Sequence, residues 1–489
     1  GDRGSVSSGQ APPLFYPRSQ PLMKYPGYDI PPGVEILRLG YRETSFATEF
    51  TGSFACDDSF YTALWHKAAN TLRVSMRDGI QDPDRERAQW WGDAVTIAGQ
   101  IFYCCDTRAH SLVRKAMRNL VDWRRADGVL YSPVPSGSWN KEVPCQMLAA
   151  VGIQGFWTYY MATGDKETIR YVYPHVRGYL NLWSIGGDGL LVPRAGDWDW
   201  VDWGDNQDRD MIEVAWYCMA LESAERMATV CGDTADARAF PKRRAGLIRS
   251  VNRRWWRRRS GYRSPRHISS ADDRANGLAV VAGIADRSKW GSLRRLLARQ
   301  SHASPYMEKY VLEAFFVMGD AFGGLARMKR RYAGMVESDL TTLWEHWYRV
   351  GESYNHGWAG GPLTLLSQYV LGVAPLEPGY GRYRLMPQMG PLRSVDATVP
   401  TIKGPIVVHL ERADSSFILR MHSPPGTAAM VGIPRYHAVS WERITANGYP
   451  VWGRGGRHGH LEGVEFDTPS PTHLFFGVAP GEWEFKASP

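Results

Sequence analysis

The spacing of apolar residues changes once along this chain, and the change limits the fold more than any other feature. From about residue 53 to 374, apolar residues recur every three or four positions, as on one face of an α-helix. After about residue 375 the apolar runs become short and rich in β-branched residues, as at 406–410 and 417–421, with turn-forming residues between them. The pattern predicts a helical domain followed by a β domain.

The helical region divides into about twelve segments. The first begins at 56–59, where Asp58 can cap a helix, and the others are expected near 92–106, 108–126, 145–164, 166–183, 208–231, 235–255, 272–284, 288–301, 305–319, 320–333 and 357–372. Twelve helices in six antiparallel pairs match an (α/α)6 barrel. A helical solenoid would show a fixed repeat length, which the sequence lacks.

We therefore predict a mainly α chain in three parts. Residues 1–52 form an extended arm or a small β remnant, residues 53–374 form the (α/α)6-barrel catalytic domain, and residues 375–489 form a C-terminal antiparallel β-sandwich.

Composition excludes several classes of protein. With 44% hydrophobic residues and 20 Trp, the chain can fill a large core, so it is not a disordered or fibrous protein. No apolar run reaches about 18 residues, so no membrane span is expected. The six Cys form no CxxC pair, which argues against a zinc site, and no metal or cofactor is expected. We favour an extracytoplasmic location, periplasmic or secreted.

One stretch is strongly basic. Residues 253–259 read RRWWRRR, a mixture of Arg and aromatic residues that can indicate nucleic-acid binding. The whole chain carries only +8 over 55.1 kDa, so a solvated helix end followed by a hairpin is the favoured interpretation and no nucleic-acid partner is expected. A third interpretation is that the stretch attracts a polysaccharide that carries uronates.

Three predicted loops combine acidic residues with tryptophan. They read QDPDRERAQWWGDA at 81–94, GDWDWVDWGD at 196–205 and TTLWEHW at 341–347, the last followed by SYNHGW at 353–358. An indole ring can stack on the C–H face of a pyranose while carboxylates accept hydrogen bonds from its hydroxyls. Glycoside hydrolysis needs two carboxyl groups on opposite sides of the anomeric carbon, and distant loops can supply one each.

Structural roles compete with this interpretation. Asp82, Asp84 and Asp93 could cap helices, and Asp93 occupies the position expected of an N-cap. The Trp residues could belong to the core, and His356 could be a hydrogen-bonded core histidine. In the second loop the four Asp cannot all be buried without partners, so packing alone does not explain it.

The three loops together resemble the motifs of glycoside hydrolase family 78, the α-L-rhamnosidases. The first motif is matched by Pro83, Arg85, Glu86, Arg87, Trp90, Gly92, Asp93 and Ala94, the second by Gly196-Asp197-Trp198, and the third by 341–347 with Asn355-His356. The chain differs where the family has an Asp five or six residues before Glu86, since the nearest acid here is Asp82.

The resemblance implies an exo-acting, inverting hydrolase that releases terminal α-L-rhamnose, or a similar L- or deoxy sugar, from a plant or microbial glycan. Glu86 would be the general acid and Glu345 the general base. The residues expected to bind the sugar are Asp82, Arg85, Trp90, Asp93, Asp197, Trp198, Trp203, Trp344 and His356. The partner is an oligo- or polysaccharide, and acidic glycans are among the candidates.

Two other functions stay open. Another (α/α)6 enzyme, such as a polysaccharide lyase, could use Tyr354 and His356 as its acid and base. A glycan-binding protein without activity would keep the Trp residues and need neither Glu86 nor Glu345.

Overall fold

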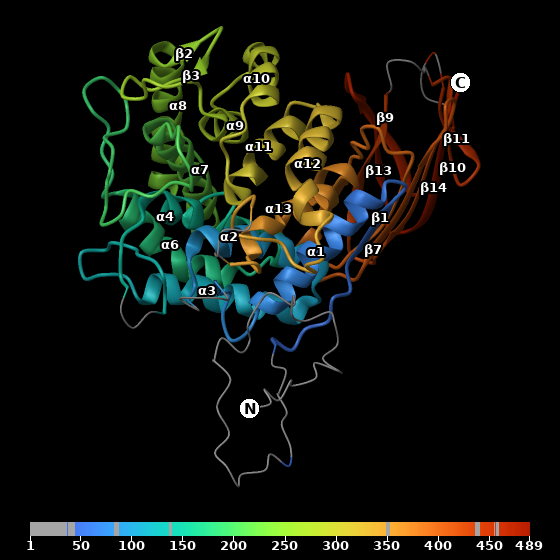
Figure 1. Cartoon of the computed structure of the whole chain (residues 1–489). Helices are drawn as coiled ribbons and strands as arrows, with labels where there is room; N and C mark the ends of the chain where they lie inside the picture. The colour runs from blue at the N-terminus through green and yellow to red at the C-terminus, as the bar shows by residue number, and fades with distance from the viewer. Residues whose placement is uncertain are drawn as a thin grey trace, which may run out of the picture.

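The structure is a computed structural model that describes Leu37 and residues 45–82, 88–135, 139–348, 353–435, 441–453, 455 and 459–489. Its helices form one part of the molecule and its sheets lie beside them (Figure 1). The helices are α1 (Ser59–Ser75), α2 (Trp91–Cys104), α3 (His110–Asp122), α4 (Pro144–Val151), α5 (Phe156–Thr163), α6 (Lys166–Leu180), α7 (Arg209–Cys231), α8 (Thr234–Arg254), α9 (Asp273–Val281), α10 (Arg287–Arg299), α11 (Pro305–Val317), α12 (Ala321–Val336) and α13 (Gly361–Leu365).

Side-chain caps explain where most helices begin. Eight of these helices start just after an Asp or Ser whose side chain accepts a hydrogen bond from a backbone N–H of the first turn. Asp58 caps α1 in this way, as predicted. The helical periodicity and these caps together account for the predicted helix positions.

One predicted helix is broken. Residues 145–164 form α4 and α5 instead of a single helix. A Cβ atom at Gly155 would lie 2.0 Å from the carbonyl oxygen of Ala150, and one at Gly152 would lie 2.8 Å from that of Leu148. The chain can fold back this tightly only because both positions are glycine. The last predicted helix, 357–372, is also irregular, since α13 lies between a 3₁₀ turn at Gly357–Gly360 and a π-helical turn at Leu366–Val370.

The C-terminal part contains two sheets. The larger has the order β1-β6-β7-β8-β14-β10-β11 and the smaller β12-β13-β9-β5-β4. The strands are β1 (Ser53–Cys56), β4 (Val373–Pro375), β5 (Arg382–Leu385), β6 (Ser394–Val399), β7 (Ile406–Arg412), β8 (Phe417–Ser423), β9 (Ala428–Pro434), β10 (Arg443–Ala446), β11 (Tyr449–Gly453), β12 (Val464–Pro469), β13 (His473–Val478) and β14 (Gly481–Ser488).

The predicted β-sandwich is confirmed, with two details that the sequence pattern did not reveal. The rings of Phe476 in β13 and Phe485 in β14 lie 5.4 Å apart, which joins the two sheets. All pairs in these sheets are antiparallel except β5 with β9, which is parallel. Strand β1 precedes the first helix yet pairs with β6, so the start of the helical region is tied to the C-terminal sheet.

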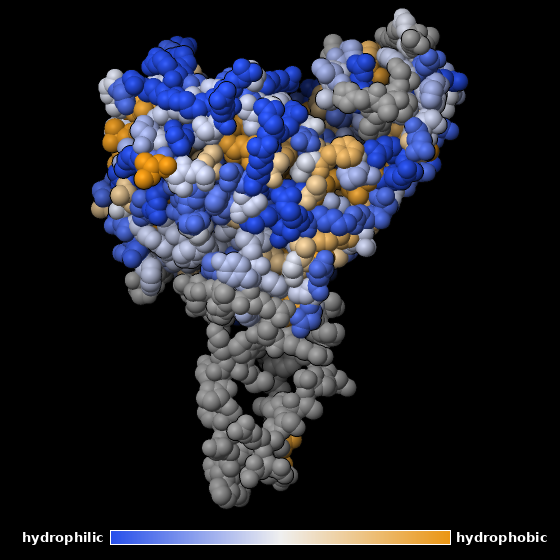
Figure 2. Space-filling view, turned by 45° about the horizontal axis from the view of Figure 1, so that its top comes forward, coloured by the Kyte–Doolittle hydropathy of each residue, from blue (hydrophilic) through white to orange (hydrophobic). Residues whose placement is uncertain are grey.

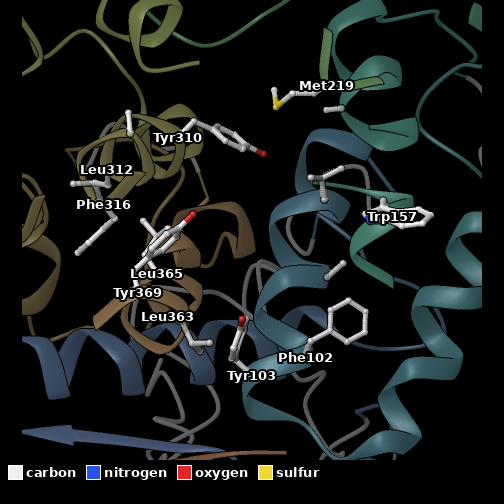
Figure 3. Packing of buried hydrophobic residues seen from close by; sticks show 14 of the residues in the cluster. Phe102, Tyr103, Trp157, Met219, Tyr310, Leu312, Phe316, Leu363, Leu365 and Tyr369 are labelled. Atoms are coloured by element: carbon white, nitrogen blue, oxygen red, sulfur yellow. The ribbon is translucent and has the colours of Figure 1, made fainter. Parts of the chain in front are cut away.

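Aromatic and aliphatic side chains fill the helical part. Figure 3 shows them pointing inward from several helices, among them Phe102 and Tyr103 of α2, Trp157 of α5 and Phe316 of α11. Hydrophilic residues cover much of the face seen in Figure 2. None of the described helices combines the length and the apolar character that crossing a bilayer requires.

Candidate active site

Parts of the three acidic, Trp-containing loops meet in the structure. They are the connections from α1 to α2, from α6 to α7, and from α12 to the 3₁₀ turn before α13. His356 of the third loop lies next to Asp82 and Asp93 of the first, and Trp203 of the second donates to Glu345 of the third. Folding therefore brings together side chains that lie more than 250 positions apart in the sequence.

Backbone pairing fixes the third loop. The N–H of Glu345 donates to the carbonyl oxygen of Ser353 at 3.0 Å, and the N–H of His356 donates to that of Leu343 at 2.9 Å. Helix α1 anchors the same loop, because Leu343 N–H donates to Thr71 Oγ1 at 2.8 Å. This doubled-back arrangement sets the side chains of Glu345 and His356 side by side.

Glu345 is a buried carboxylate with donors on both oxygens. The residue is 1% exposed. Its Oε1 accepts from Trp203 Nε1 at 3.2 Å, and its Oε2 accepts from the backbone N–H of Ser353 at 3.3 Å. A buried carboxylate needs such partners because burial without them is costly. The contacts hold one orientation of the side chain.

Three carboxylates surround the imidazole of His356. Its Nε2 lies 2.8 Å from Asp93 Oδ1, and its Nδ1 lies 3.7 Å from Glu345 Oε2 and 4.0 Å from Asp82 Oδ1. Burial lowers the pKa of His356, but these carboxylates outweigh burial and raise its pKa to about 9. The ring is therefore an imidazolium at neutral pH, and it offsets part of the negative charge gathered at the site.

This shift predicts a pH-dependent contribution to stability. The folded pKa of about 9 lies above the ordinary value of 6.5, so the stabilisation is complete below about pH 6.5 and disappears as the pH rises through 9. We expect the difference in unfolding free energy between the wild type and His356→Gln to shrink by about 3 kcal/mol over that range. Denaturant unfolding at several pH values measures it.

His66→Gln is the control for this experiment, because His66 is exposed. Its unfolding free energy should follow that of the wild type at every pH. A wild-type to His356→Gln difference that stays constant between pH 6.5 and 9.5 would contradict the charged imidazole.

Asp93 does not cap a helix, contrary to the expectation from its position. Helix α2 begins at Trp91 with Trp90 as its N-cap residue, so Asp93 is the third residue of the first turn. The side chain is 4% exposed and points to His356 instead. A carboxylate in this turn is also favoured by the helix dipole, which explains why the turn tolerates it without capping.

Tryptophan rings line up from the site toward the surface. Trp90 packs edge-on against Trp198 at 6.0 Å between ring centres, and Trp198 lies 6.5 Å from Trp203. Trp198 and Trp203 are half-buried, whereas Trp90 is buried. Trp139, which the sequence did not single out, continues the row on the other side of Trp90 and is 43% exposed. Such a row can offer indole faces to a sugar.

A second aromatic group lies beneath His356 and also escaped prediction. Trp358 is 4.2 Å from the His356 ring and stacks nearly parallel on Trp200 at 6.0 Å. Tyr306 of α11 packs against both indoles. All three are buried. The sequence did hold a sign of these residues, because Trp200 alternates with Asp in its loop and Trp358 follows His356 by two residues. Sequence alone, however, does not distinguish a buried indole that supports the site from an indole that contacts the sugar.

A buried ion pair holds the second loop in place. Arg274 of α9 is fully buried and contacts Asp202 at 3.2 Å and Asp272 at 2.8 Å. Its Nη1 also donates to the carbonyl oxygen of Trp203 at 3.1 Å. Burial raises the pKa of Asp202 to about 6, although Arg274 and Ser304 oppose the shift. Arg274 thus fixes the backbone of Trp203, the residue that donates to Glu345.

Arg274→Met removes the only side-chain cation that contacts both Asp202 and Asp272 among the described residues. We expect it to lower the free energy of unfolding by about 3 to 5 kcal/mol, because two carboxylates stay buried without their counter-charge. Chemical denaturation measures the change. Arg299→Met, at an exposed position, is the matched control and should change the stability little. Equal losses in the two variants would contradict a structural role for Arg274.

The other residues predicted to bind the sugar are not among those that surround His356. Asp197 is partly exposed, pairs with Arg125 and accepts the N–H of Glu142 at 2.8 Å, and these contacts lower its pKa, the Glu142 N–H most. Trp344 is buried against Tyr354. Glu86 and Arg85 lie outside the described residues. The N–H of Asp82 donates to the carbonyl oxygen of Ala88 at 3.1 Å, so the two ends of that five-residue gap are joined.

The described part of the chain was predicted to need no metal ion. Its His, Cys, Asp and Glu residues form no group of three or more arranged to hold a metal ion. The site offers carboxylates, an imidazolium and indoles, which are suited to acid–base chemistry on a sugar.

Known proteins resemble this chain over most of its length. Residues 49–370 match the bacterial α-L-rhamnosidase six-hairpin glycosidase domain, and residues 372–443 match the bacterial α-L-rhamnosidase C-terminal domain. The α-L-rhamnosidase of Streptomyces avermitilis is 23% identical over 425 residues, which cover 82% of this chain and 40% of that protein. One from Alteromonas sp. is 20% identical, with 72% and 41% covered. The chain thus spans less than half the length of these relatives.

Solved structures show the same fold. The α-L-rhamnosidase of Dictyoglumus thermophilum superposes with a TM-score of 0.76 at 17% identity, over 91% of this chain and 51% of that one. The Streptomyces avermitilis enzyme in complex with L-rhamnose has a TM-score of 0.75 at 20% identity, over 90% and 42%. Since the first family domain alone spans 322 of the 489 residues, the chain belongs to glycoside hydrolase family 78, the α-L-rhamnosidases.

Proposed function

We propose that this protein is an exo-acting glycoside hydrolase that releases terminal α-L-rhamnose, or a similar L- or deoxy sugar, from a plant or microbial glycan with inversion. The observation that carries the proposal is Glu345, a buried carboxylate oriented by two N–H donors beside an imidazolium and a row of indoles. The relatives named above are α-L-rhamnosidases, which supports the choice of sugar.

Glu345 is proposed as the general base. Its fixed carboxylate would take a proton from a water molecule as that water attacks the anomeric carbon. Glu86 is proposed as the general acid that protonates the leaving oxygen. Support for Glu86 comes from the chain around it, because Asp82 lies beside His356 and is joined to Ala88. An inverting pair should stand about 6.5–9.5 Å apart, which leaves room for the water.

The remaining predicted residues are proposed to hold the sugar. Asp82, Asp93 and His356 supply hydrogen-bonding groups at the buried end of the site. Indole surface comes from Trp90, Trp198 and Trp203. Further contacts to the sugar are proposed for Arg85, Asp197 and Trp344. A charged His356 can donate to a sugar hydroxyl.

The charge of His356 also argues against a lyase. If His356 were the base of a lyase, its ring would have to be unprotonated to remove the proton next to a uronate carboxylate. With its pKa raised to about 9, His356 carries its own proton at neutral pH and is a poor base there.

A panel of aryl glycosides tests the proposed reaction. The aryl α-L-rhamnoside should be hydrolysed much faster than the corresponding glucoside, galactoside or arabinoside, and glycans capped with rhamnose, including acidic ones, should then lose that sugar. A preference for another glycone would contradict the proposed specificity, and no release from any member would contradict hydrolysis.

A further inference from the structure

Positive charge is concentrated in one part of the chain. Residues 238–299 contain 18 Lys and Arg against three Asp and no Glu, a net charge of +15 with His neutral. The whole chain carries only +8, so all other residues together carry −7. The basic segment corresponds to α8, the short hairpin of β2 (Trp256–Arg257) and β3 (Gly261–Tyr262), α9 and α10. Figure 1 shows α8, β2, β3 and α10 together at one edge of the molecule.

Six arginines at this edge form what we call the arginine ridge. They are Arg253, Arg254, Arg257, Arg258, Arg259 and Arg263, and all six are exposed. None pairs with a carboxylate within the described chain, and the side-chain hydrogen bonds of Arg257 and Arg263 go to backbone carbonyls. Other arginines of the segment are used internally, as Arg244 is by Glu222 and Arg266 by Asp210. The ridge is thus a concentration of unneutralised charge.

The backbone that carries the ridge is held in place. Tyr262 is buried, its ring packs on Trp256 at 5.0 Å, and its hydroxyl donates to Asn252 Oδ1 at 2.7 Å. Gly261 has a φ of +74° and lies so close to α10 that a Cβ would meet Leu296 at 2.7 Å. The hairpin therefore sits tightly on α10, and the arginines project from an ordered turn whose geometry can favour one ligand over another.

The ridge adjoins the candidate active site through the second loop. The backbone N–H of Ser264, next to Arg263, donates to Asp208 Oδ2 at 2.8 Å, and Asp208 N–H donates to Asp272 at 2.9 Å. Asp272 pairs with Arg274, which holds the backbone of Trp203. Buried contacts therefore link the turn that carries Arg263 to Trp203, which donates to Glu345.

From these observations we infer that the arginine ridge is a binding surface for the body of a uronate-bearing polysaccharide whose terminal sugar enters the site. This inference rests on the proposed function. Guanidinium groups pair with planar carboxylates through two parallel hydrogen bonds, and a row of them suits carboxylates repeated along a polymer. A glycan is favoured over nucleic acid because the turn that carries Arg263 is linked to the loop of Trp203, which belongs to the proposed sugar site.

The test compares two triple variants that each remove three exposed charges. Arg257→Ser/Arg258→Ser/Arg259→Ser alters the ridge, whereas Arg114→Ser/Lys166→Ser/Arg170→Ser removes exposed charges from α3 and α6, away from the hairpin (Figure 1). A third variant, Arg257→Lys/Arg258→Lys/Arg259→Lys, keeps the charge. Calorimetry at low salt measures binding to polygalacturonate, dextran sulfate, uncharged dextran and a short DNA duplex.

We expect the Ser ridge variant to bind polygalacturonate about tenfold more weakly than the α3/α6 variant, since three exposed ion pairs are lost. The Lys variant should retain most of the affinity, and added salt should weaken wild-type binding. Equal losses in the two Ser variants would overturn the inference. Tighter binding of dextran sulfate would overturn the choice of uronate over sulfate, and tighter binding of DNA would overturn the choice of glycan.

Turnover of the aryl α-L-rhamnoside separates this inference from the proposed function. None of the substituted residues is proposed to hold the terminal sugar, so kcat/KM for this small substrate should be unchanged in all three variants. If the wild type does not hydrolyse it, the proposed function fails, yet the polygalacturonate measurement still decides whether the ridge binds an acidic glycan.

Discussion

Replacing Glu345 with Gln should lower kcat for an aryl α-L-rhamnoside by about two to four orders of magnitude, the range that general acid–base catalysis usually contributes. An amide is close to a carboxylate in shape but cannot take the proton of the attacking water. One of the two donors, Trp203 Nε1 or Ser353 N–H, would keep the amide oxygen as its acceptor, whereas the other would face the NH2 group. The side chain keeps its size and shape, so we expect rhamnose binding to be retained. Steady-state kinetics measures kcat, and calorimetry with rhamnose measures binding.

Glu337→Gln is the matched control, because Glu337 is an exposed glutamate close by in the sequence. It should leave kcat unchanged. A Glu345→Gln variant that turns over within a few-fold of the wild type would remove Glu345 from the mechanism. A wild type that binds rhamnosides without hydrolysing them would instead identify a glycan-binding protein.

Glu86→Gln should have an effect that depends on the leaving group. With an alkyl α-L-rhamnoside, whose leaving oxygen needs a proton, the loss in kcat/KM should be about two to four orders of magnitude. With a dinitrophenyl rhamnoside, whose leaving group departs as a stable anion, the loss should nearly vanish. Glu345→Gln should be impaired on both substrates, because water must be activated in each case.

This pair of variants also distinguishes the two roles from each other. If Glu86→Gln loses the same factor on both substrates, then Glu86 does not donate the proton. If Glu345→Gln recovers on the activated substrate and Glu86→Gln does not, the two roles are reversed.

Local signals made much of the fold predictable. Helical periodicity and capping residues such as Asp58 marked where helices begin, since both act within a few residues. Two short apolar runs with a turn between them marked β7 and β8, which pair with Leu410 opposite Leu419. The places where a predicted helix is interrupted depend instead on close contacts between backbone atoms. Gly155 breaks a helix because of the carbonyl of Ala150, and no periodic pattern encodes that contact.

The sequence predicted which residue types form the candidate site, but not which of these residues contact one another. The loops were recognised by their carboxylates and indoles, and the structure joins Asp82, Asp93, Glu345 and His356. Arg274 was missed because it stands alone in its helix, and only folding places it between Asp202 and Asp272. Trp358 was missed as a support for His356 for a similar reason, since buried and substrate-facing indoles look alike in a sequence.

Glu345 is proposed to direct a single displacement by water at the anomeric carbon of a terminal α-L-rhamnosyl unit. Proton NMR of the sugar released from an α-L-rhamnoside, recorded before mutarotation, distinguishes this single displacement from a double one. With a single displacement, β-L-rhamnose should appear first and then equilibrate. Initial appearance of the α anomer would show retention and contradict the proposed role of Glu345.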